Sequence, residues 1–333
     1  MKNPASPAPV MRGLPATLTS RLRLPVIAAP MLHVSGIDLV SAACRSGVIG
    51  AFPTANARSV DELDHWLRRI EESLRDCEVP PAPWCPNLIV RQPRLHDDLA
   101  CLVRHRVEMV ITSVGSPAPV IPALHDIGCL VLADVATLAH AHKALEAGAD
   151  GLVLLTAGAG GQTGWLNPFA FVRAVRAFFD GPLVLAGGMA DGAAVWAAQV
   201  LGCDLAYMGT RFIAASESMA APAYRQMLVD SSMDDVVLTR AFSGLEANML
   251  QASIRAAGLD PAKLDEQVSA ATAKELYGNS ANATGPRRWS DIWSAGHSVS
   301  GVQGVEPVAE LVERIASEYR AARLATAGLN EHS

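Results

Sequence analysis

A glycine-rich loop with one long polar side chain is the clearest place for chemistry in this sequence. The loop follows the apolar run 152–155, carries Gln162, and has glycines at 158, 160, 161 and 164. Glycines directly after a buried strand allow positive φ and let backbone N–H groups approach a ligand closely. We therefore expect Gln162 to face a bound ligand, although a tight turn that only packs helices would use the same glycines.

Two further glycine turns follow later apolar runs. Gly187 and Gly188 come after the run 182–186, and Gly209 and Thr210 come after the run 205–208. Backbone N–H groups in such turns bind anions, and a threonine hydroxyl adds one more donor. Glycines are common in loops generally, but their place after both runs favours a phosphate-binding site.

Eight apolar runs alternate with helix-like stretches between residues 24 and 212. Strict alternation predicts an α/β fold with a parallel sheet, and eight units favour a closed (β/α)8 TIM barrel over an open sheet. The runs are 26–31, 48–52, 84–90, 109–113, 128–134, 151–155, 182–186 and 205–208.

The alternation stops after Phe212, which suggests a division of the chain into three parts. Residues 1–20 are expected to form a loosely laid N-terminal lead-in. Residues 21–213 and 286–325 are expected to form the barrel. The segment 214–285 has a helical pattern, so we expect a mostly helical insertion after strand eight that would cover the barrel mouth as a lid.

Composition excludes several classes of partner. The net charge is −6 with no basic block, which argues against nucleic acid and anionic membranes. No apolar run approaches the ~20 residues of a membrane helix. The 6 cysteines lack metal-ligand spacing, so reduced thiols, a cytoplasmic location and no metal site are expected.

Acids, bases and nucleophiles are scarce where a barrel places its active site, at the ends of the strands. Only Asp134 supplies a carboxylate there, no lysine does, and no Ser-His-Asp pattern occurs. A cofactor is therefore expected to carry the reaction.

Several of these motifs together resemble the nitronate monooxygenase (2-nitropropane dioxygenase) family. The resemblance runs from about residue 22 to 213, with a further piece at 293–299 that is similar to the family's late loop. The motifs are Ala29-Pro30-Met31, Asn87, the loop with Gly160 and Gly161, the stretch 186–192 and the stretch 202–212.

The resemblance implies an FMN-dependent TIM barrel and assigns roles by position. Ala29, Pro30 and Met31 would line the isoalloxazine ring, and Asn87 would bond to it. The phosphate would be held by the two glycine turns. The remaining cofactor-binding positions would be Gly160, Gly161, Met208 and Asp134, the last standing where many relatives carry a lysine near the phosphate.

The main departure from the family is at Gln162, where nitronate-oxidising members carry a histidine proposed as the catalytic base. A neutral amide cannot take a proton at pH 7. A nitronate is already an anion and needs no deprotonation, so Gln162 suits a nitronate better than a neutral nitroalkane. His33 and His297 are further candidates for carrying protons.

The resulting hypothesis is an FMN-dependent oxidoreductase that oxidises a nitronate or similar small substrate with O₂. The alternative keeps FMN but uses NAD(P)H as donor, as a quinone or enoyl-thioester reductase. A non-catalytic ligand-binding barrel, which would bind no flavin, is a further alternative. A resemblance to inosine-monophosphate dehydrogenases ranks lower because no cysteine stands at a suitable strand-end loop. Whether the chain forms a homodimer is open.

Overall fold

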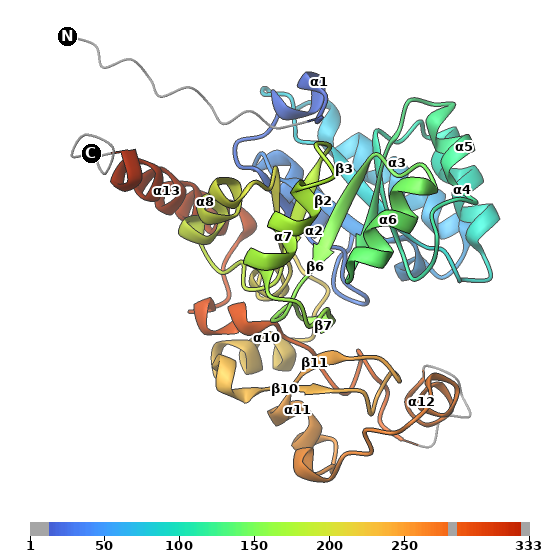
Figure 1. Cartoon of the computed structure of the whole chain (residues 1–333), viewed down its shortest axis with the longest axis vertical. Helices are drawn as coiled ribbons and strands as arrows, with labels where there is room; N and C mark the ends of the chain where they lie inside the picture. The colour runs from blue at the N-terminus through green and yellow to red at the C-terminus, as the bar shows by residue number, and fades with distance from the viewer. Residues whose placement is uncertain (1–12, 279–284, 328–333) are drawn as a thin grey trace.

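The fold is a closed barrel of eight parallel strands with an inserted lobe at one end (Figure 1). It is known here from a computed structural model that describes residues 13–278 and 285–327. The barrel strands follow chain order, each pairs with the next, and β9 pairs with β1 to close the ring. This confirms the predicted (β/α)8 architecture.

All eight predicted strands are present, with small shifts at their ends. The first is shorter than expected because the chain leaves the sheet before Pro30. The bounds are β1 (Val26–Ala28), β2 (Ile49–Pro53), β3 (Trp84–Ile89), β4 (Met109–Ser113), β5 (Leu130–Val135), β6 (Gly151–Leu155), β8 (Leu183–Ala186) and β9 (Leu205–Met208).

Helices cover the outside of the barrel, and local sequence signals set several of their ends. The Ser59 hydroxyl accepts a hydrogen bond from the Glu62 N–H (3.1 Å) at the start of α3. Gly202 ends α8 with φ +119°, the left-handed conformation that glycine adopts most readily. The helices are α2 (Ile37–Arg45), α3 (Val60–Arg75), α4 (Leu95–Arg104), α5 (Ile121–His125), α6 (Leu138–Glu146), α7 (Pro168–Arg176), α8 (Gly192–Leu201) and α13 (Val308–Ala327).

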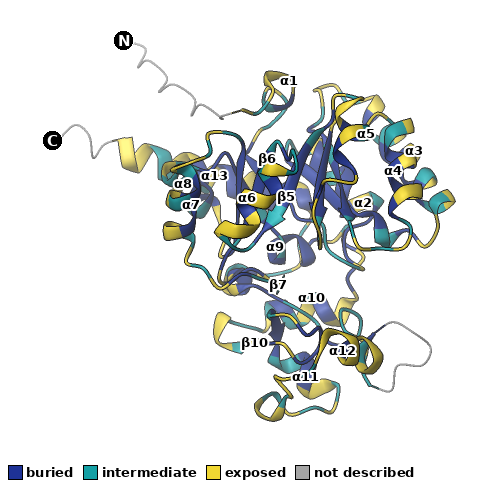
Figure 2. Cartoon of the chain, turned by 45° about the vertical axis from the view of Figure 1, so that its right-hand side comes forward, coloured by how far each residue is buried: buried dark blue, intermediate teal, exposed yellow. Residues whose placement is uncertain are grey.

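The barrel interior is filled by alternate residues of the strands. Ile49 and Ala51 of β2 belong to the interior cluster, whereas Phe52 packs outward beneath the helices. The strands are accordingly buried on both faces (Figure 2), which explains why the sequence reads as continuous apolar runs.

The expectation of a loosely laid lead-in over 1–20 is wrong for its described part. Residues 16–19 form the short helix α1 (Ala16–Thr19), and Leu18 is buried against the interior cluster of the barrel. An apolar side chain stabilises this position because an open barrel end would expose the core to water. Residues 1–12 lie outside the described residues.

The inserted lobe lies at the carboxyl ends of the barrel strands (Figure 1). It contains two strands that the expectation of a mostly helical insertion missed. Each is only four residues long, so its apolar pattern was too short to read. The elements from β9 to α13 are α9 (Thr210–Ile213), α10 (Pro222–Val229), β10 (Val236–Thr239), β11 (Ala247–Leu250), α11 (Gln251–Ala256), α12 (Ala270–Tyr277) and short 3₁₀ turns. Residues 279–284 of the insertion lie outside the described residues.

The lobe is joined to the barrel by a shared sheet. The glycine-rich loop after β6 forms β7 (Gly161–Gln162), which pairs antiparallel with β11 through Gln162 and Ala247. The sheet order is β10-β11-β7. The loop that carries Gln162 therefore belongs to both parts of the molecule.

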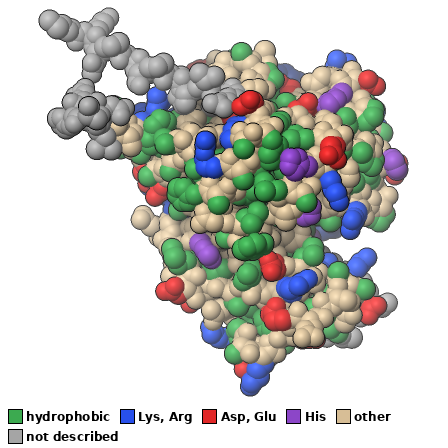
Figure 3. Space-filling model, viewed as in Figure 1, with side chains coloured by type: hydrophobic (Ala, Val, Ile, Leu, Met, Phe, Trp, Pro, Cys, Tyr) green, Lys and Arg blue, Asp and Glu red, His purple; other side chains and the backbone are tan. Residues whose placement is uncertain are grey.

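The charges on the face seen in Figure 3 are mixed, with acidic and basic side chains interspersed over barrel and lobe. Within the described ranges 13–278 and 285–327, no helix combines the length and the apolar character needed to cross a membrane. All 6 cysteines are free thiols, as expected, and Cys77 alone is not fully buried.

Candidate active site

A cavity of about 400 Å³ opens at the carboxyl ends of the barrel strands, where the lobe and the late loop meet the barrel. Its size falls in the range of small-molecule and cofactor sites. Twelve of the fifteen residues predicted for the site line it. They are Ala29, Pro30, Met31, Asn87, Asp134, Gly160, Gly161, Gln162, Gly187, Gly188, Gly209 and Thr210.

The other three predicted residues, Met208, His33 and His297, do not line the cavity. The Met208 side chain is buried in the core, and its carbonyl accepts from the Ala29 N–H (2.9 Å). His33 is exposed in a left-handed turn with φ +61°. Partial desolvation by neighbouring groups, together with the charge of Arg287, lowers the pKa of His33. His297 is exposed and begins a 3₁₀ turn. The structure thus does not bring either histidine to the cavity.

The turn after β8 is shaped to leave room for a ligand. Gly187 and Gly188 both have positive φ, +116° and +72°. A Cβ on Gly187 would lie 2.4 Å from the Thr156 hydroxyl oxygen, whereas a Cβ on Gly188 would meet nothing within 4 Å. Gly188 therefore presents its backbone to open space at the edge of the cavity.

The turn after β9 is fixed by the late loop. The buried Thr210 hydroxyl accepts a hydrogen bond from the Gly296 N–H (3.0 Å). A hydroxyl oxygen that accepts in this way still has its own O–H to donate. Thr210 thus stands beside Gly209 with a donor available to a ligand in the cavity.

The glycine-rich loop after β6 packs backbone to backbone against the late loop. A Cβ on Gly160 would lie 2.7 Å from the Gly296 nitrogen, and one on Gly296 would lie 2.5 Å from the Gly158 carbonyl oxygen. The buried Asn248 of β11 donates to the Ala159 carbonyl (2.7 Å) from the lobe side. These glycines are required by close approach, and together they set the position of β7 and Gln162.

Polar side chains from the barrel strands, among them Asn87, Asp134 and Tyr207, form the floor of the cavity. Asn87 is buried, donates to the Ile111 carbonyl (3.3 Å) and accepts from the Ser113 hydroxyl (3.2 Å). Burial raises the pKa of Asp134 to about 7, and its Oδ1 has no hydrogen-bond partner among the described residues. Burial, with the nearby Asp134 carboxyl, raises the pKa of Tyr207 well above its usual range. An unpartnered buried carboxyl oxygen in a cavity wall is a group that a ligand can satisfy.

The lobe contributes a wall that the sequence analysis did not anticipate. Tyr224 of α10 lines the cavity and donates its hydroxyl to the Ser294 carbonyl (2.5 Å). Its ring stacks on Trp293 with a centroid separation of 5.0 Å. Arg288 and Trp289 also line the cavity.

Four of the cavity residues that the sequence analysis did not predict, Tyr207, Tyr224, Arg288 and Trp289, differ in how far the sequence could have indicated them. Tyr207 lies in a predicted strand, two residues after the interior residue Leu205, so strand alternation could have found it. Tyr224, Arg288 and Trp289 follow no such period, because their positions depend on how the lobe folds back.

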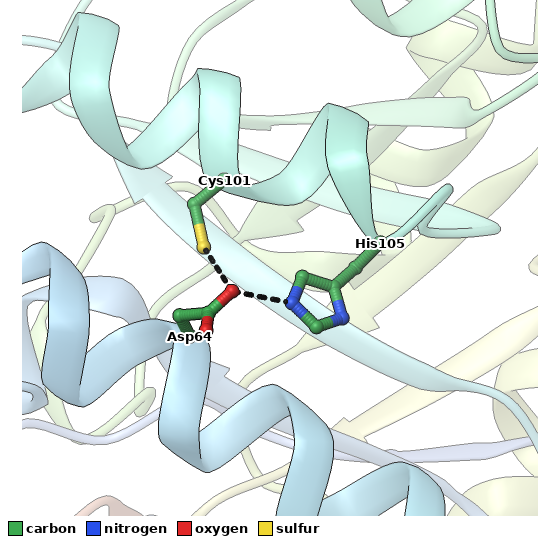
Figure 4. A group of neighbouring side chains, drawn as sticks. All are labelled: Asp64, Cys101 and His105. Atoms are coloured by element: carbon green, nitrogen blue, oxygen red, sulfur yellow. Dashed lines mark hydrogen bonds and ion pairs between the residues drawn. The ribbon is translucent and has the colours of Figure 1, made fainter.

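A second group of polar residues lies between α3 and α4, away from the cavity (Figure 4). His105 Nε2 is 2.9 Å from Asp64 Oδ1, and the Cys101 sulfur is 4.0 Å from the same oxygen. Asp64 also forms ion pairs with Arg68 (2.5 Å) and Arg104 (3.6 Å). The His105 hydrogen bond and these charges lower the pKa of Asp64. Two arginines would repel a metal cation here, so the cluster is best described as an ion-pair network joining the two helices.

Comparison with known proteins identifies the family. A family model described as nitronate monooxygenase matches residues 90–318. The chain belongs to the nitronate monooxygenase family. It is therefore an oxidoreductase, and the resemblance drawn from its motifs is confirmed.

Relatives with two kinds of named activity are similar to this family member. A nitronate monooxygenase of Paraburkholderia phytofirmans is 27% identical over 89% of this chain and 92% of its own length. A protein of Mycobacterium tuberculosis named (3aS,4S,5R,7aS)-5-hydroxy-7a-methyl-1-oxo-octahydro-1H-indene-4-carboxyl-CoA dehydrogenase is 25% identical over 72% of this chain, which spans 66% of that relative.

Solved structures with the same fold also include proteins of two different names, FabK and a nitroalkane oxidase. FabK from Thermotoga maritima superposes with a TM-score of 0.78 at 26% identity, covering 94% of this chain and 97% of its own. A nitroalkane oxidase from Streptomyces ansochromogenes superposes with a TM-score of 0.75 at 26% identity, covering 93% of this chain and all (100%) of its own.

Proposed function

We propose that this nitronate monooxygenase family member is an FMN-dependent enzyme that oxidises a nitronate or similar small substrate with O₂. The observation that carries the proposal is that one cavity combines two glycine turns suited to an anion with a buried carboxyl oxygen that has no hydrogen-bond partner. Gly188 faces open space, Thr210 has a hydroxyl to donate, and Asp134 has a carboxyl oxygen without a partner in the described chain.

These residues fit FMN as a ligand. The backbone of Gly188 and the Thr210 hydroxyl would hold the phosphate, because main-chain N–H groups and a hydroxyl are the donors that phosphates use. Asn87 and Asp134 would face the ring system from the barrel floor. When bound, FMN would supply the electron-accepting chemistry that the side chains here lack.

Gln162 would orient the substrate and would not deprotonate it. Its amide can donate to an oxygen of a nitronate and accept from a hydroxyl or water, but it holds no proton-accepting site at neutral pH. The antiparallel pairing of β7 with β11 fixes its backbone. From this backbone position the amide would orient a substrate, and because it cannot take a proton it favours a substrate that arrives already ionised.

A second candidate function is supported by the relatives. FabK and the mycobacterial dehydrogenase are similar to this chain over most of the barrel, so an NAD(P)H-dependent flavin reductase acting on a quinone or enoyl thioester uses the same cavity. The two proposals differ in the electron donor and in the electron acceptor. Both require bound flavin.

The deciding experiment is an absorbance spectrum of the purified protein followed by two anaerobic titrations. We expect a flavin spectrum that is bleached by the nitronate of nitroethane and changes slowly with NADH or NADPH. Rapid bleaching by NADH or NADPH alone would favour the reductase. A colourless protein that does not bind added FMN would refute both proposals.

A further inference from the structure

The cavity contains one cationic side chain among the described residues, Arg288 of the lobe wall. It is half-buried, and its guanidinium donates to the carbonyl of Phe242 (3.1 Å). A guanidinium has five N–H donors in a planar fork, so most of its hydrogen-bonding capacity is left over. No acidic side chain in the described ranges forms an ion pair with it.

The carboxyl of Asp134 does not neutralise Arg288, although both line the cavity. Burial lowers the pKa of Arg288 and raises that of Asp134, and neither shift has a contribution from the other group. A half-buried cation without a counter-charge costs free energy unless a ligand supplies the charge.

Arg288 is followed by a tryptophan that reaches toward the loop of Gln162. The neighbouring Trp289 has a positive φ of +68°, a strained conformation for a bulky residue. Its ring comes within 3.7 Å of a Cβ built on Gly161, next to Gln162. Gln162, Arg288 and Trp289 thus line the same side of the cavity, next to the lobe.

We propose that Arg288 is the specificity-determining residue that binds a planar, two-oxygen anionic group of the substrate, a nitronate or a carboxylate. The guanidinium fork matches two oxygens of such a group. The inference rests on the proposed function, because it treats this wall as the substrate side of a flavin-containing cavity. It adds to the proposed function the residue that would bind the negatively charged group of the substrate.

The test compares propionate with propionamide, its neutral isostere, as ligands of the FMN-loaded protein at constant ionic strength. Binding is followed by the change in flavin absorbance. We expect propionate to bind at least about tenfold more tightly than propionamide, since a charge-assisted pair of hydrogen bonds contributes this much or more. Equal affinities for the two compounds would overturn the proposal.

Variants then show whether Arg288 is the cationic residue that binds propionate. Arg288→Gln should lower propionate affinity at least about tenfold and leave propionamide unchanged. The control is Arg287→Gln, because Arg287 is exposed, lies outside the cavity lining and pairs with Asp291 (3.0 Å). Arg288→Lys keeps the charge without the fork and should bind propionate with intermediate affinity. Propionate affinity within twofold of the parent in both Arg288 variants would overturn the proposal.

The outcomes separate this inference from the proposed function. A protein that is not reduced by a nitronate, yet loses propionate affinity on Arg288→Gln, would refute the reaction and keep the anion site. A protein that oxidises nitronates with propionate affinity unchanged in the variants would refute the anion site alone.

Discussion

The two sides of the cavity are built by different means. The turns after β8 and β9 present main chain and one hydroxyl, with Gly188 facing open space. The lobe wall presents side chains: Gln162 comes from β7, which pairs with β11 of the lobe, and Arg288 and Trp289 come from the segment after α12. A turn that binds through its backbone tolerates few residue types, whereas a wall of side chains can change with the substrate. Under the proposed function, cofactor binding would belong to the barrel and substrate choice to the lobe.

The largest effect is expected for Gln162→His, which adds a base to the lobe-side wall. If position 162 is where the missing base belongs, turnover of neutral nitroethane should rise by about 10²–10⁴-fold, the usual contribution of a positioned general base. Turnover of the preformed nitronate should change little. Steady-state oxygen consumption with both substrate forms measures this.

Gln162→Asn is the matched control, because it keeps an amide and adds no base. No rise at all in nitroethane turnover with histidine at 162 would show that the base of this active site belongs elsewhere. The assignment of substrate orientation to the lobe wall and of cofactor binding to the barrel turns would then need revision.

A large effect on stability is expected at Asp134, on the barrel side. Its folded-state pKa of about 7 lies above the ordinary value of 3.8. Between these two pH values the unfolded chain releases a proton that the folded protein keeps, so stability falls as pH rises and stays low above pH ~7. Asp134→Asn should remove this dependence and stabilise the cofactor-free protein at pH 8 by up to about 4 kcal/mol.

Thermal unfolding of parent and Asp134→Asn proteins between pH 5 and 8 measures that difference. The gap in Tm should widen from pH 5 to 7. A constant gap would mean that the Asp134 carboxyl is ionised in the folded state across this range, and that the floor is more polar than its burial indicates.

A smaller effect is expected from Gly188→Ala, which places a methyl group in the open space of the turn. The dissociation constant for FMN should rise at least about tenfold, because a steric clash that costs about 1.4 kcal/mol of binding free energy has this effect. Gly258→Ala is the control, because Gly258 also has positive φ (+81°) and open surroundings but lies after α11 in the lobe. Both variants carry a similar backbone penalty.

Isothermal titration of cofactor-free protein with FMN distinguishes the two glycine variants. Tm should fall by similar amounts in both, while only Gly188→Ala weakens FMN binding. Equal FMN affinities would contradict a main-chain phosphate site at this turn.

Much of the barrel side was predictable because its signals are local. The apolar runs gave the eight strands, and Ser59 and Gly202 marked helix ends through their own hydrogen bonds and φ. The glycines at 187 and 188 could be assigned to a ligand site since strand ends of a barrel share one face. The roles of His33 and His297 could not be judged, because the direction of a loop side chain depends on tertiary contacts.

The sequence by itself determined the barrel, the glycine turns and the scarcity of catalytic side chains, since each follows from residue types at short spacing. Only the tertiary structure decided that β7 joins the lobe's sheet and that Arg288 lines the cavity. Arg288 is more than a hundred residues from Gln162 in the chain. No local periodicity links them, because their proximity comes from strand pairing and packing between segments far apart in sequence.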